Sequence, residues 1–377
     1  MKIGFDAKRA AQNRTGLGNY SRFVIRILAD AYPDDKQYLY IPNPNKTPYL
    51  SEAKTKDERH TFAMRFPKGI WSRMRSLWRV WGIADDVKND NIDIFHGLSN
   101  ELPLNIRSAK CRSVVTIHDL IFIHCPQYYH WIDRKIYNYK FRKACRNADR
   151  VIAVSEYTKR EIMNYYNTPE EKIDVVYQGC DPAFSQPIAA EKLDEVARRY
   201  NLPKTFILYV GSIEERKNLM LVAKAMSRSK GGTTKVVAVG KKTKYVDNIK
   251  ECLEENGISD SFMFLHDVPF ADLPSFYRLA TAFVYPSRIE GFGIPMLEAI
   301  SSGLPAIGCT GSCLEEAGGP HSIYVNPDDD EAMAKAISAV VNDKTLRETM
   351  ISKGREYAKN FTDEVLARKL HEVYEKT

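Results

Sequence analysis

The sequence predicts two α/β domains, each built on a doubly wound parallel sheet. The chain has 377 residues, which is more than one hydrophobic core usually serves. Short apolar strands alternate with helical segments, as they do in parallel sheets, and this alternation starts again near residue 206. A stretch rich in Gly and Pro at 178–187 separates the two runs, so we place the linker near 180–190.

The first domain is expected to span residues 1–185. Its first strand, 2–6, leads into a polar loop that contains Gly16 and Gly18, and the apolar periodicity from 20 to 28 predicts a helix. Residues 156–166 suit a further helix. Short apolar runs predict the remaining strands of this domain at 92–95, 113–117 and 150–154.

The second domain is expected to span residues 186–360. Its predicted strands are 206–210, 235–239, 262–265 and 282–285. Its predicted helices lie near 218–229, 244–256 and 271–280. A last helix, near 363–374, has an apolar face formed by Val365, Leu366, Leu370 and Val373. We therefore expect the segment 361–377 to pack against the protein, with the first domain as one candidate surface.

Composition excludes several classes of protein. With 44% hydrophobic and 27% charged residues the chain is expected to fold. Its start places Asp6 early and offers no long apolar run, so neither a secretory signal nor a membrane span is expected. The seven cysteines form no CxxC pair, which favours a reducing compartment, and we expect a cytoplasmic protein. Cys309 and Cys313 have no His or second Cys pair nearby, so no metal site is expected.

A net charge of +7 favours anionic partners, and one stretch is both basic and aromatic. Residues 64–83 carry no acid, and their cations and tryptophans are Arg65, Lys68, Arg73, Arg75, Arg79, Trp71, Trp78 and Trp81. Such a helix can lie on anionic lipid at the inner face of a membrane. The alternative places the tryptophans in the core and the arginines in solvent. Nucleic-acid binding is not expected, because no recognised module accompanies the stretch.

A glycine-containing motif marks the second domain. It reads Glu290-Gly-Phe-Gly-Ile-Pro-Met-Leu-Glu298, with Pro295 where a helix would start and Gly303 where it would end. The helix N-terminus then faces the carboxyl end of the sheet, where its backbone N–H groups favour a phosphate. Glu290 is expected in the turn and Glu298 in about the first helical turn, and both can accept hydrogen bonds from hydroxyls. Either glutamate alone could be an ordinary loop or helix-start residue.

The motif resembles that of the retaining glycosyltransferases of family 4, which have the GT-B fold. The spacing of the two glutamates, the preceding Tyr285-Pro-Ser287 and the following Ser302-Gly-Leu-Pro305 all fit this family. Other segments match it in order, at 15–20, 118–119, 153–158, 176–181, 210–218 and 361–374. The resemblance implies two Rossmann-like domains that face a cleft and a donor that is a nucleotide-sugar.

The resemblance also implies a role for each matching residue of the second domain. Glu290 would touch the donor sugar and Glu298 the ribose, while Lys217 and Arg216 would neutralise the leaving diphosphate. Ser212, at a position where the family often has an Arg, is implied as a donor contact. Further implied donor contacts are Gly291, Phe292, Gly293 and Ile294 at the motif, and Gly240, Lys241, His266, Asp267 and Val268 at strand ends. A solvated Arg216-Lys217 pair and an exposed His266 are the ordinary alternatives.

In the first domain, Gly16 and Gly18 lack the third glycine of a dinucleotide fingerprint because Ser21 stands there, which disfavours a dehydrogenase. The resemblance implies that this loop approaches the donor diphosphate or the acceptor, and a plain tight turn is the alternative. His118 follows a predicted strand, and the matching His of the family contacts the transferred sugar. A structural His is its alternative. His96, Gly97 and Asp119 are expected to line the acceptor site.

The resemblance therefore implies a retaining hexosyltransferase with His118, Glu290, Lys217 and Arg216 as catalytic residues. Its acceptor would be a glycan or a lipid-linked saccharide in cell-surface polysaccharide synthesis. The resemblance of 209–218 to enzymes of mannose-containing polysaccharides makes GDP-mannose the first candidate donor and a UDP-sugar the second. No cofactor is expected, because cations and a helix N-terminus can take the diphosphate charge. A sugar-nucleotide-binding protein without turnover is the alternative class.

Overall fold

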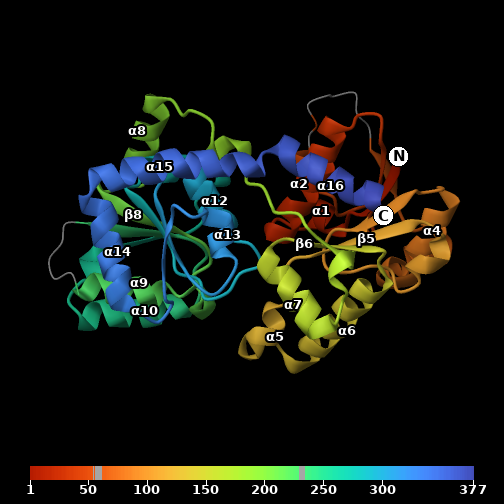
Figure 1. Ribbon diagram of the computed structural model, residues 1–377, viewed down its shortest axis with the longest axis horizontal. Coiled ribbons are helices and arrows are strands. Elements are labelled where there is room, and N and C mark those ends of the chain that lie inside the picture. The colour runs from red at the N-terminus through yellow and green to blue at the C-terminus, as the bar shows by residue number, and fades with distance from the viewer. Residues whose placement is uncertain (54, 56–61, 229–233) are drawn as a thin grey trace. The chain divides into compact units, whose positions relative to one another are not determined.

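The computed structural model describes residues 1–53, 55, 62–228 and 234–377. The described chain divides into two compact units. Residues 1–179 and 361–377 form the first unit, and residues 180–360 form the second. Within each unit, helices lie on both faces of a sheet (Figure 1).

The described part of the first unit holds seven parallel strands in the order β3-β2-β1-β4-β5-β6-β7. The strand order reverses direction between β1 and β4, which is the position where open α/β sheets bind ligands. The strands are β1 (Lys2–Asp6), β2 (Lys36–Tyr40), β3 (Ala63–Arg65), β4 (Ile94–Gly97), β5 (Arg112–Ile117), β6 (Arg150–Ala153) and β7 (Ile173–Val175). The helices are α1 (Lys8–Gln12), α2 (Gly16–Ala31), α3 (Arg75–Leu77), α4 (Ile83–Asn89), α5 (Ile121–His124), α6 (Trp131–Asn147), α7 (Glu156–Tyr166) and α16 (Asp363–Lys376).

The described part of the second unit holds six parallel strands in the order β10-β9-β8-β11-β12-β13. Here the order reverses between β8 and β11. The strands are β8 (Phe206–Val210), β9 (Lys235–Val239), β10 (Phe262–Leu265), β11 (Ala282–Tyr285), β12 (Ala306–Cys309) and β13 (Ile323–Val325). The helices are α8 (Ala190–Arg199), α9 (Leu219–Arg228), α10 (Tyr245–Glu255), α11 (Leu273–Leu279), α12 (Ile294–Ser301), α13 (Leu314–Gly318), α14 (Asp330–Asn342) and α15 (Lys344–Ala358).

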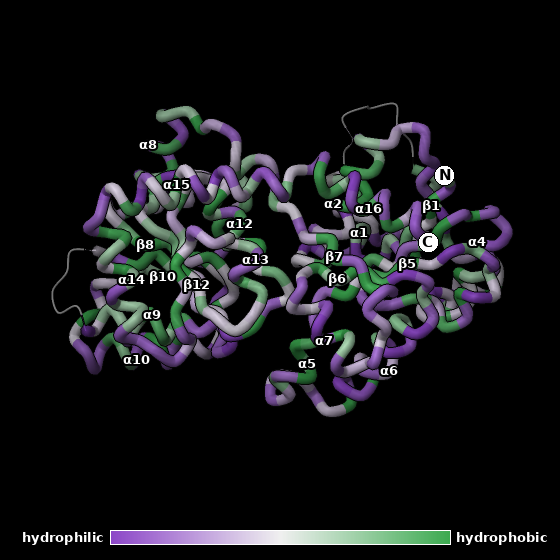
Figure 2. The backbone as a smooth tube through the Cα atoms, viewed as in Figure 1, coloured by the Kyte–Doolittle hydropathy of each residue, from purple (hydrophilic) through white to green (hydrophobic). Residues whose placement is uncertain are grey.

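Central strands of both sheets are apolar on both sides because helices cover both faces. Every residue of β4, β11 and β12 is buried, and hydrophobic residues concentrate along the strands (Figure 2). The eight strands predicted from the sequence are all present, although β4 begins two residues later than expected. The predicted helix 218–229 is observed as α9, and its position 229 lies outside the described residues. The strands β2, β3, β7, β12 and β13 were not predicted.

The segment around Gly16 and Gly18 corrects one prediction. It is the first turn of α2 rather than a loop, with Thr15 as the residue that precedes the helix. A Cβ atom at Gly18 would lie 1.8 Å from the carbonyl oxygen of Asn13, so glycine allows the helix to begin directly against the preceding segment. Gly16 faces open space. The dense packing at Gly18, rather than helix propensity, therefore sets the start of α2.

The stretch 64–83 is not one amphipathic helix. It contains the last two residues of β3, a 3₁₀ turn at Gly69–Ser72, α3, a π-helical turn at Trp78–Gly82 and the first residue of α4. Trp78 is fully buried in the core, and its Nε1–H group donates to Asp86 at 2.7 Å. Arg79 is ion-paired with Asp6 at 2.7 Å rather than free to meet lipid. Among the described residues, no helix combines the length and apolar character needed to cross a bilayer.

The C-terminal helix α16 is part of the first unit. Its residues Leu366, Leu370, Val373 and Tyr374 are buried. Arg26 of α2 forms an ion pair with Asp363 at 2.7 Å at the start of the helix. The chain therefore returns to the first unit after completing the second.

Candidate active site

The connection from β11 to α12 has the geometry that its motif predicts. Helix α12 begins at Ile294 with Pro295 in its first turn, and its C-cap, Ser302, directly precedes Gly303. Gly293, the N-cap residue, has a φ of +104°, which disfavours any residue with a side chain. A Cβ atom there would also lie 2.7 Å from Cδ2 of Leu314. Gly293 is therefore required both by its backbone conformation and by its packing.

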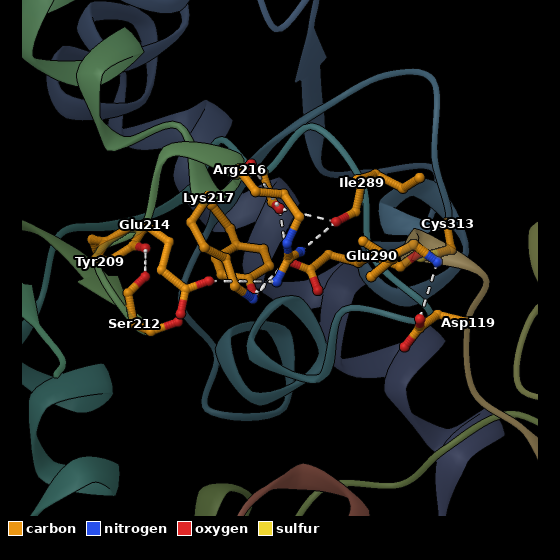
Figure 3. A network of polar contacts seen from close by, with 12 residues as sticks. Asp119, Tyr209, Ser212, Glu214, Arg216, Lys217, Ile289, Glu290 and Cys313 are labelled. Atoms are coloured by element: carbon orange, nitrogen blue, oxygen red, sulfur yellow. Dashed lines mark hydrogen bonds and ion pairs between the residues drawn. The ribbon is translucent and has the colours of Figure 1, made fainter. Parts of the chain in front are cut away.

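Glu290 lies in this connection and receives several donors on one oxygen atom (Figure 3). Its Oε1 accepts hydrogen bonds from Nζ of Lys217 at 2.6 Å, from Oγ of Ser287 at 2.6 Å and from the Tyr285 hydroxyl at 3.1 Å. Nη1 of Arg216 lies 3.0 Å from the same oxygen. The structure thus brings together three of the four predicted catalytic residues.

The two cations come from the segment that follows β8. Arg216 and Lys217 lie in a 3₁₀ turn, and Asn218 adopts a left-handed conformation before α9 begins. Arg216 also donates to the carbonyl oxygen of Ile289 at 2.6 Å. Because β8 and β11 are adjacent in the sheet, the segments after their carboxyl ends meet. The pairing of Glu290 with both cations is therefore a consequence of strand order.

Electrostatics hold Glu290 in its ionised form. Burial alone would raise the pKa of this carboxyl group, but the charges of Lys217 and Arg216 outweigh burial and lower the pKa to about 2. A group with this pKa is a carboxylate at any pH near neutrality. Glu290 can therefore accept hydrogen bonds or stabilise positive charge, but it is not a proton donor.

Glu298 has a contrasting environment. It is the fifth residue of α12, at the start of the second helical turn and so close to its predicted position. Its Oε2 accepts a hydrogen bond from the Tyr277 hydroxyl at 2.7 Å. Burial raises the pKa of Glu298 to about 7 despite this hydrogen bond. The two glutamates of the motif therefore differ in charge state near neutral pH.

The remaining predicted donor contacts gather at one edge of the second sheet. Ser212, Lys241 and His266 follow the carboxyl ends of β8, β9 and β10, and Asp267 and Val268 follow His266. Lys241 and Asp267 are exposed. Nδ1 of His266 donates to the Gly240 carbonyl oxygen at 2.7 Å, and a Cβ atom at Gly240 would lie 1.8 Å from the Gly211 carbonyl oxygen. Of the motif residues, Gly291 and Ile294 are half-buried, and the Phe292 side chain is buried.

His118 is held firmly within the first unit. It follows β5, is 5% exposed, and its ring packs edge-on against Tyr20. Nε2 lies 2.9 Å from the Leu98 carbonyl oxygen, which can only accept, so Nε2 carries the proton and Nδ1 accepts from Gln178 at 3.0 Å. Burial lowers the pKa of His118 to about 4, so the ring is neutral. Both ring nitrogens have protein partners, and a role toward the sugar stays a prediction.

The residues predicted to line the acceptor site differ in how deeply they are buried. His96 is fully buried, with Nδ1 2.7 Å from the Tyr374 hydroxyl and Nε2 2.8 Å from Oγ1 of Thr116. It lies in the interior of the first unit, which corrects the prediction that it lines a binding surface. Gly97 ends β4 and is also buried. Asp119 is half-buried, and its Oδ1 accepts from the backbone N–H of Ile121 at the start of α5.

The structure also gives contacts for three residues to which the sequence had assigned no role. Tyr285 and Ser287 hydrogen-bond Glu290, and Tyr277 hydrogen-bonds Glu298. Tyr285 and Ser287 stand beside the motif in the sequence, but Tyr277 lies 21 residues before Glu298 and only the fold reveals it. In the described part of the chain, no group of three or more His, Cys, Asp or Glu side chains could hold a metal ion.

Two family models match the chain in succession. Residues 24–184 match the model Glycosyltransferase Family 4, and residues 193–357 match the model Glycosyl transferases group 1. The two matches together extend over both units. The protein is a glycosyltransferase with the GT-B fold.

Named relatives of this glycosyltransferase include O-antigen enzymes. It is 29% identical to O-antigen chain mannosyltransferase B of Escherichia coli, over 96% of each chain. It is 27% identical to O-antigen chain mannosyltransferase RfbU of Salmonella typhimurium, over 60% of each chain. Serotype-specific mannosyltransferase WbdA of Escherichia coli is 26% identical, over 67% of this chain and 32% of that protein.

Solved structures share its fold at low sequence identity. A glycosyltransferase from Rickettsia africae superposes with a TM-score of 0.76 at 17% identity, covering 100% of this chain and 97% of the other. Anabaena HepE in complex with UDP and glucose superposes with a TM-score of 0.76 at 16% identity, covering 100% of both chains. These likenesses show the GT-B fold of the glycosyltransferase.

Proposed function

We propose that this glycosyltransferase moves a mannosyl group from GDP-mannose to a hydroxyl of a glycan or lipid-linked saccharide, with retention at the anomeric carbon. The observation that carries the proposal is the ionised Glu290 held against Lys217 and Arg216 beside a helix N-terminus. The names of the relatives, which are O-antigen mannosyltransferases, support mannose and polysaccharide synthesis. The proposed location is the cytoplasm, at the inner face of the membrane.

The proposed roles follow from charge and position. Lys217 and Arg216 neutralise the diphosphate as it leaves, and the N-terminus of α12 adds to this effect. Glu290 stays charged and hydrogen-bonds the donor sugar. Glu298 accepts hydrogen bonds from the ribose hydroxyls. We assign no metal ion or cofactor to the reaction, because these groups can take the diphosphate charge themselves.

Retention is proposed to arise by attack on the same face that the diphosphate leaves. No Asp or Glu of the motif is placed as a covalent nucleophile, because the Glu290 carboxylate is already bound by two cations. The leaving diphosphate accepts the proton of the acceptor hydroxyl. His118 is a neutral ring with a protein partner on each nitrogen, so in this proposal Nδ1 exchanges its hydrogen bond from Gln178 for one from a sugar hydroxyl.

A UDP-sugar is the second candidate donor. HepE, which has a comparable fold, is described in complexes with UDP and with UDP-glucose. The two donors differ in the base, which the proposal places at the ends of β9 and β10 near Gly240 and His266. GDP and UDP binding therefore distinguishes the two candidates.

The test is a thermal-shift screen followed by a turnover assay. A ligand that binds only the folded protein at one hundred times its Kd stabilises it by about 2.7 kcal/mol, so GDP, UDP and their sugars can be ranked directly. The preferred donor is then incubated with saccharide acceptors, and the product linkage is read by nuclear magnetic resonance. We expect GDP-mannose to rank first and to yield an α-mannoside. Binding without donor consumption would identify a non-catalytic binding protein, and a β-linked product would exclude retention.

The proposed contact with a membrane is restricted to part of the stretch 64–83. Trp78 is buried there and Arg79 is ion-paired, whereas five apolar side chains are exposed: Met64, Ile70, Met74, Leu77 and Trp81. The contact would therefore use these five side chains rather than a complete helix face. Exposed cations in the same stretch, Lys68 and Arg73, favour anionic lipid.

A further inference from the structure

A cavity of about 290 Å³ lies at the switch point of the first sheet. Asp6, the last residue of β1, lines it together with Glu101 and Leu102, which follow β4. The strand order reverses between β1 and β4. Open α/β sheets bind ligands outside the carboxyl ends of their strands at this position. None of the residues assigned to the donor or to the acceptor lines the cavity.

The interior of this cavity is apolar and its charges are compensated. Val80, Leu102, Leu104 and Ile136 contribute the apolar walls. Arg79 is ion-paired with Asp6 and with Glu101, each at 2.7 Å. These three charged groups therefore satisfy one another and leave little attraction for a polar ligand such as a free sugar.

The rim of the cavity carries both cationic and aromatic side chains. Lys135 and Lys140, from α6, lie beside Tyr139 of the same helix. Lys140 reaches Glu101 at 3.4 Å, and Lys135 is exposed. When Asp6, Arg79 and Glu101 are counted with these two lysines, the side chains that line the cavity carry a net charge of +1. A ligand that fits has an apolar part and an anionic end.

The surface around the rim is also apolar. Of the twelve exposed large apolar and aromatic side chains among the described residues, ten belong to the segments 64–81 and 128–139. The two segments meet at the cavity, since Arg79 and Val80 of one and Ile136 and Tyr139 of the other line it. Trp131 is 70% and Ile132 is 52% exposed. Exposed apolar surface gathered in one place marks a binding site.

The charge of α6 indicates which kind of partner covers this surface. The helix carries six Lys and Arg residues and one acid, Asp133. Lysine is depleted in the centre of protein interfaces, whereas cations interleaved with Trp and Ile are typical of surfaces that meet anionic lipid. The pattern therefore favours a lipid over a protein partner.

We propose that the cavity binds the apolar chain of a phosphorylated lipid, whose phosphate lies at Lys135 and Lys140. The exposed face of α6 around Trp131 and Ile132 rests on the bilayer that supplies the lipid. The inference deepens the proposed function, because such a lipid would carry the acceptor saccharide. Binding of the lipid itself needs neither donor nor transfer.

Isothermal titration of the full chain with farnesyl phosphate, without nucleotide-sugar, tests the proposal. We expect farnesyl phosphate to bind at least about tenfold more tightly than inorganic phosphate, because the apolar chain is buried. Ile136→Glu should weaken binding about tenfold by placing a charge on the apolar wall. Lys135→Glu should weaken it by at least about fivefold, because the phosphate loses a cation near it.

Matched controls separate the site from general surface effects. Phe270 in the second unit is 44% exposed and Ile136 is 43% exposed, so Phe270→Glu should leave binding unchanged. Lys344→Glu, at an 81% exposed lysine of the second unit, controls for Lys135→Glu. Circular dichroism confirms that each variant is folded.

The outcomes separate this inference from the proposed transfer reaction. Equal affinity for farnesyl phosphate and inorganic phosphate would show that no apolar chain is bound and would overturn the proposal. The proposal would also be overturned if Ile136→Glu and Lys135→Glu both left the affinity for farnesyl phosphate unchanged. Trp131→Glu, on the face assigned to the bilayer, should lower sedimentation with vesicles of phosphatidylcholine and phosphatidylglycerol, and unchanged sedimentation would overturn the part assigned to the bilayer. If all these tests fail, the proposed transfer reaction still stands, with a water-soluble acceptor in place of a lipid-linked one.

Discussion

At the scale of single residues, Glu290 offers a charge rather than a proton. Its Oε1 atom is surrounded by Lys217, Arg216, Ser287 and Tyr285. The cations that hold its pKa at about 2 are the same groups that we assign to the leaving diphosphate. A diphosphate bound at these cations would therefore share them with Glu290, which stays paired while it hydrogen-bonds the sugar.

Substitution of this pair tests its role in transfer. We expect Lys217→Ala and Glu290→Gln each to lower kcat by about 10²-fold or more, because a preorganised charge is lost from the reacting centre. Gln is chosen over Ala at position 290 because it keeps the hydrogen bonds to Ser287 and Tyr285. Donor consumption at saturating nucleotide-sugar is the measurement. The exposed Glu255 provides a matched control as Glu255→Gln, and wild-type turnover in either test variant would remove the pair from the mechanism.

Glu298 gives rise to a dependence of stability on pH. Its pKa is about 7 in the folded protein and 4.5 is its ordinary value, so the folded state retains the proton over this range more strongly than the unfolded state. Stability is therefore lost as the pH rises from about 4.5 to 7, and the loss is complete above 7. Glu298→Gln removes this loss and should stabilise the protein by up to about 3 kcal/mol at pH 8, but not at pH 4.5.

Differential scanning calorimetry of wild type and Glu298→Gln at several pH values measures this effect. The unfolding midpoint of the variant should exceed that of wild type progressively from pH 4.5 to 8. An equal difference at all pH values would mean that the shift in pKa is absent. Donor affinity provides a second measurement, because a Gln at this position keeps only one acceptor oxygen for the ribose.

What the sequence could predict about these residues depends on their separation along the chain. The motif identified Glu290 and Glu298 because the turn, Pro295 and the helix lie within nine residues. The sequence did not show which side chains contact these glutamates. Lys217 lies 73 residues from Glu290 and contacts it only because β8 pairs with β11. Likewise, nothing near His96 shows that Tyr374, 278 residues away, buries it.

At the scale of the elements, the β11–α12 connection depends on Gly293. We expect Gly293→Ala to destabilise the protein by about 1–2 kcal/mol through its left-handed backbone alone, and by more because the new methyl group meets Leu314. Gly311→Ala is the matched control, since Gly311 has a φ of +89° and open space around it. The difference between the two variants, measured as unfolding free energy in urea, isolates the steric part.

A double-mutant cycle checks this assignment. Leu314→Ala alone should cost about 2–5 kcal/mol, because Leu314 is fully buried. In the Gly293→Ala background its cost should be smaller by about 0.5–3 kcal/mol, since the shortened side chain makes room for the methyl group. Additive costs, or equal costs of Gly293→Ala and Gly311→Ala, would contradict the steric contact.

Most of the strands that were predicted correctly contain a continuous apolar run, which a short stretch of sequence is enough to reveal. Strands such as β8 and β9 are apolar runs with polar residues beyond them. Three of the strands that were missed are weaker in this respect: β2 (Lys36–Tyr40) carries two polar residues at its start, and β7 and β13 have three residues each. The start of α2 was missed because close packing of Gly18 against Asn13, rather than propensity, determines it. Local sequence thus predicts the apolar strands, and tertiary packing decides the rest.

At the scale of the whole molecule, the chain closes the first unit with its own C-terminus. The Tyr374 hydroxyl of α16 hydrogen-bonds His96 of β4, and the other ring nitrogen of His96 hydrogen-bonds Oγ1 of Thr116. The same Oγ1 lies 3.1 Å from the Tyr20 hydroxyl. Burial lowers the pKa of His96 to about 3, so the ring is neutral and needs a partner on each nitrogen. The Tyr20 ring in turn packs against His118. The buried hydrogen bonds of the first unit are therefore complete only when α16 is packed in place.

Tyr374→Phe tests this coupling between the two ends of the chain. The substitution keeps the ring but leaves Nδ1 of the buried His96 without its partner, so we expect a loss of about 1–3 kcal/mol. Amide hydrogen exchange by mass spectrometry should show faster exchange in β4, β5 and α2 of the first unit, with β11 and α12 of the second unchanged. Tyr357→Phe, which removes a hydroxyl that donates to the Glu316 carbonyl oxygen in the second unit, should have the converse pattern. Faster exchange across both units in Tyr374→Phe would instead show that the two units unfold together, because a defect confined to the first unit would then destabilise the second.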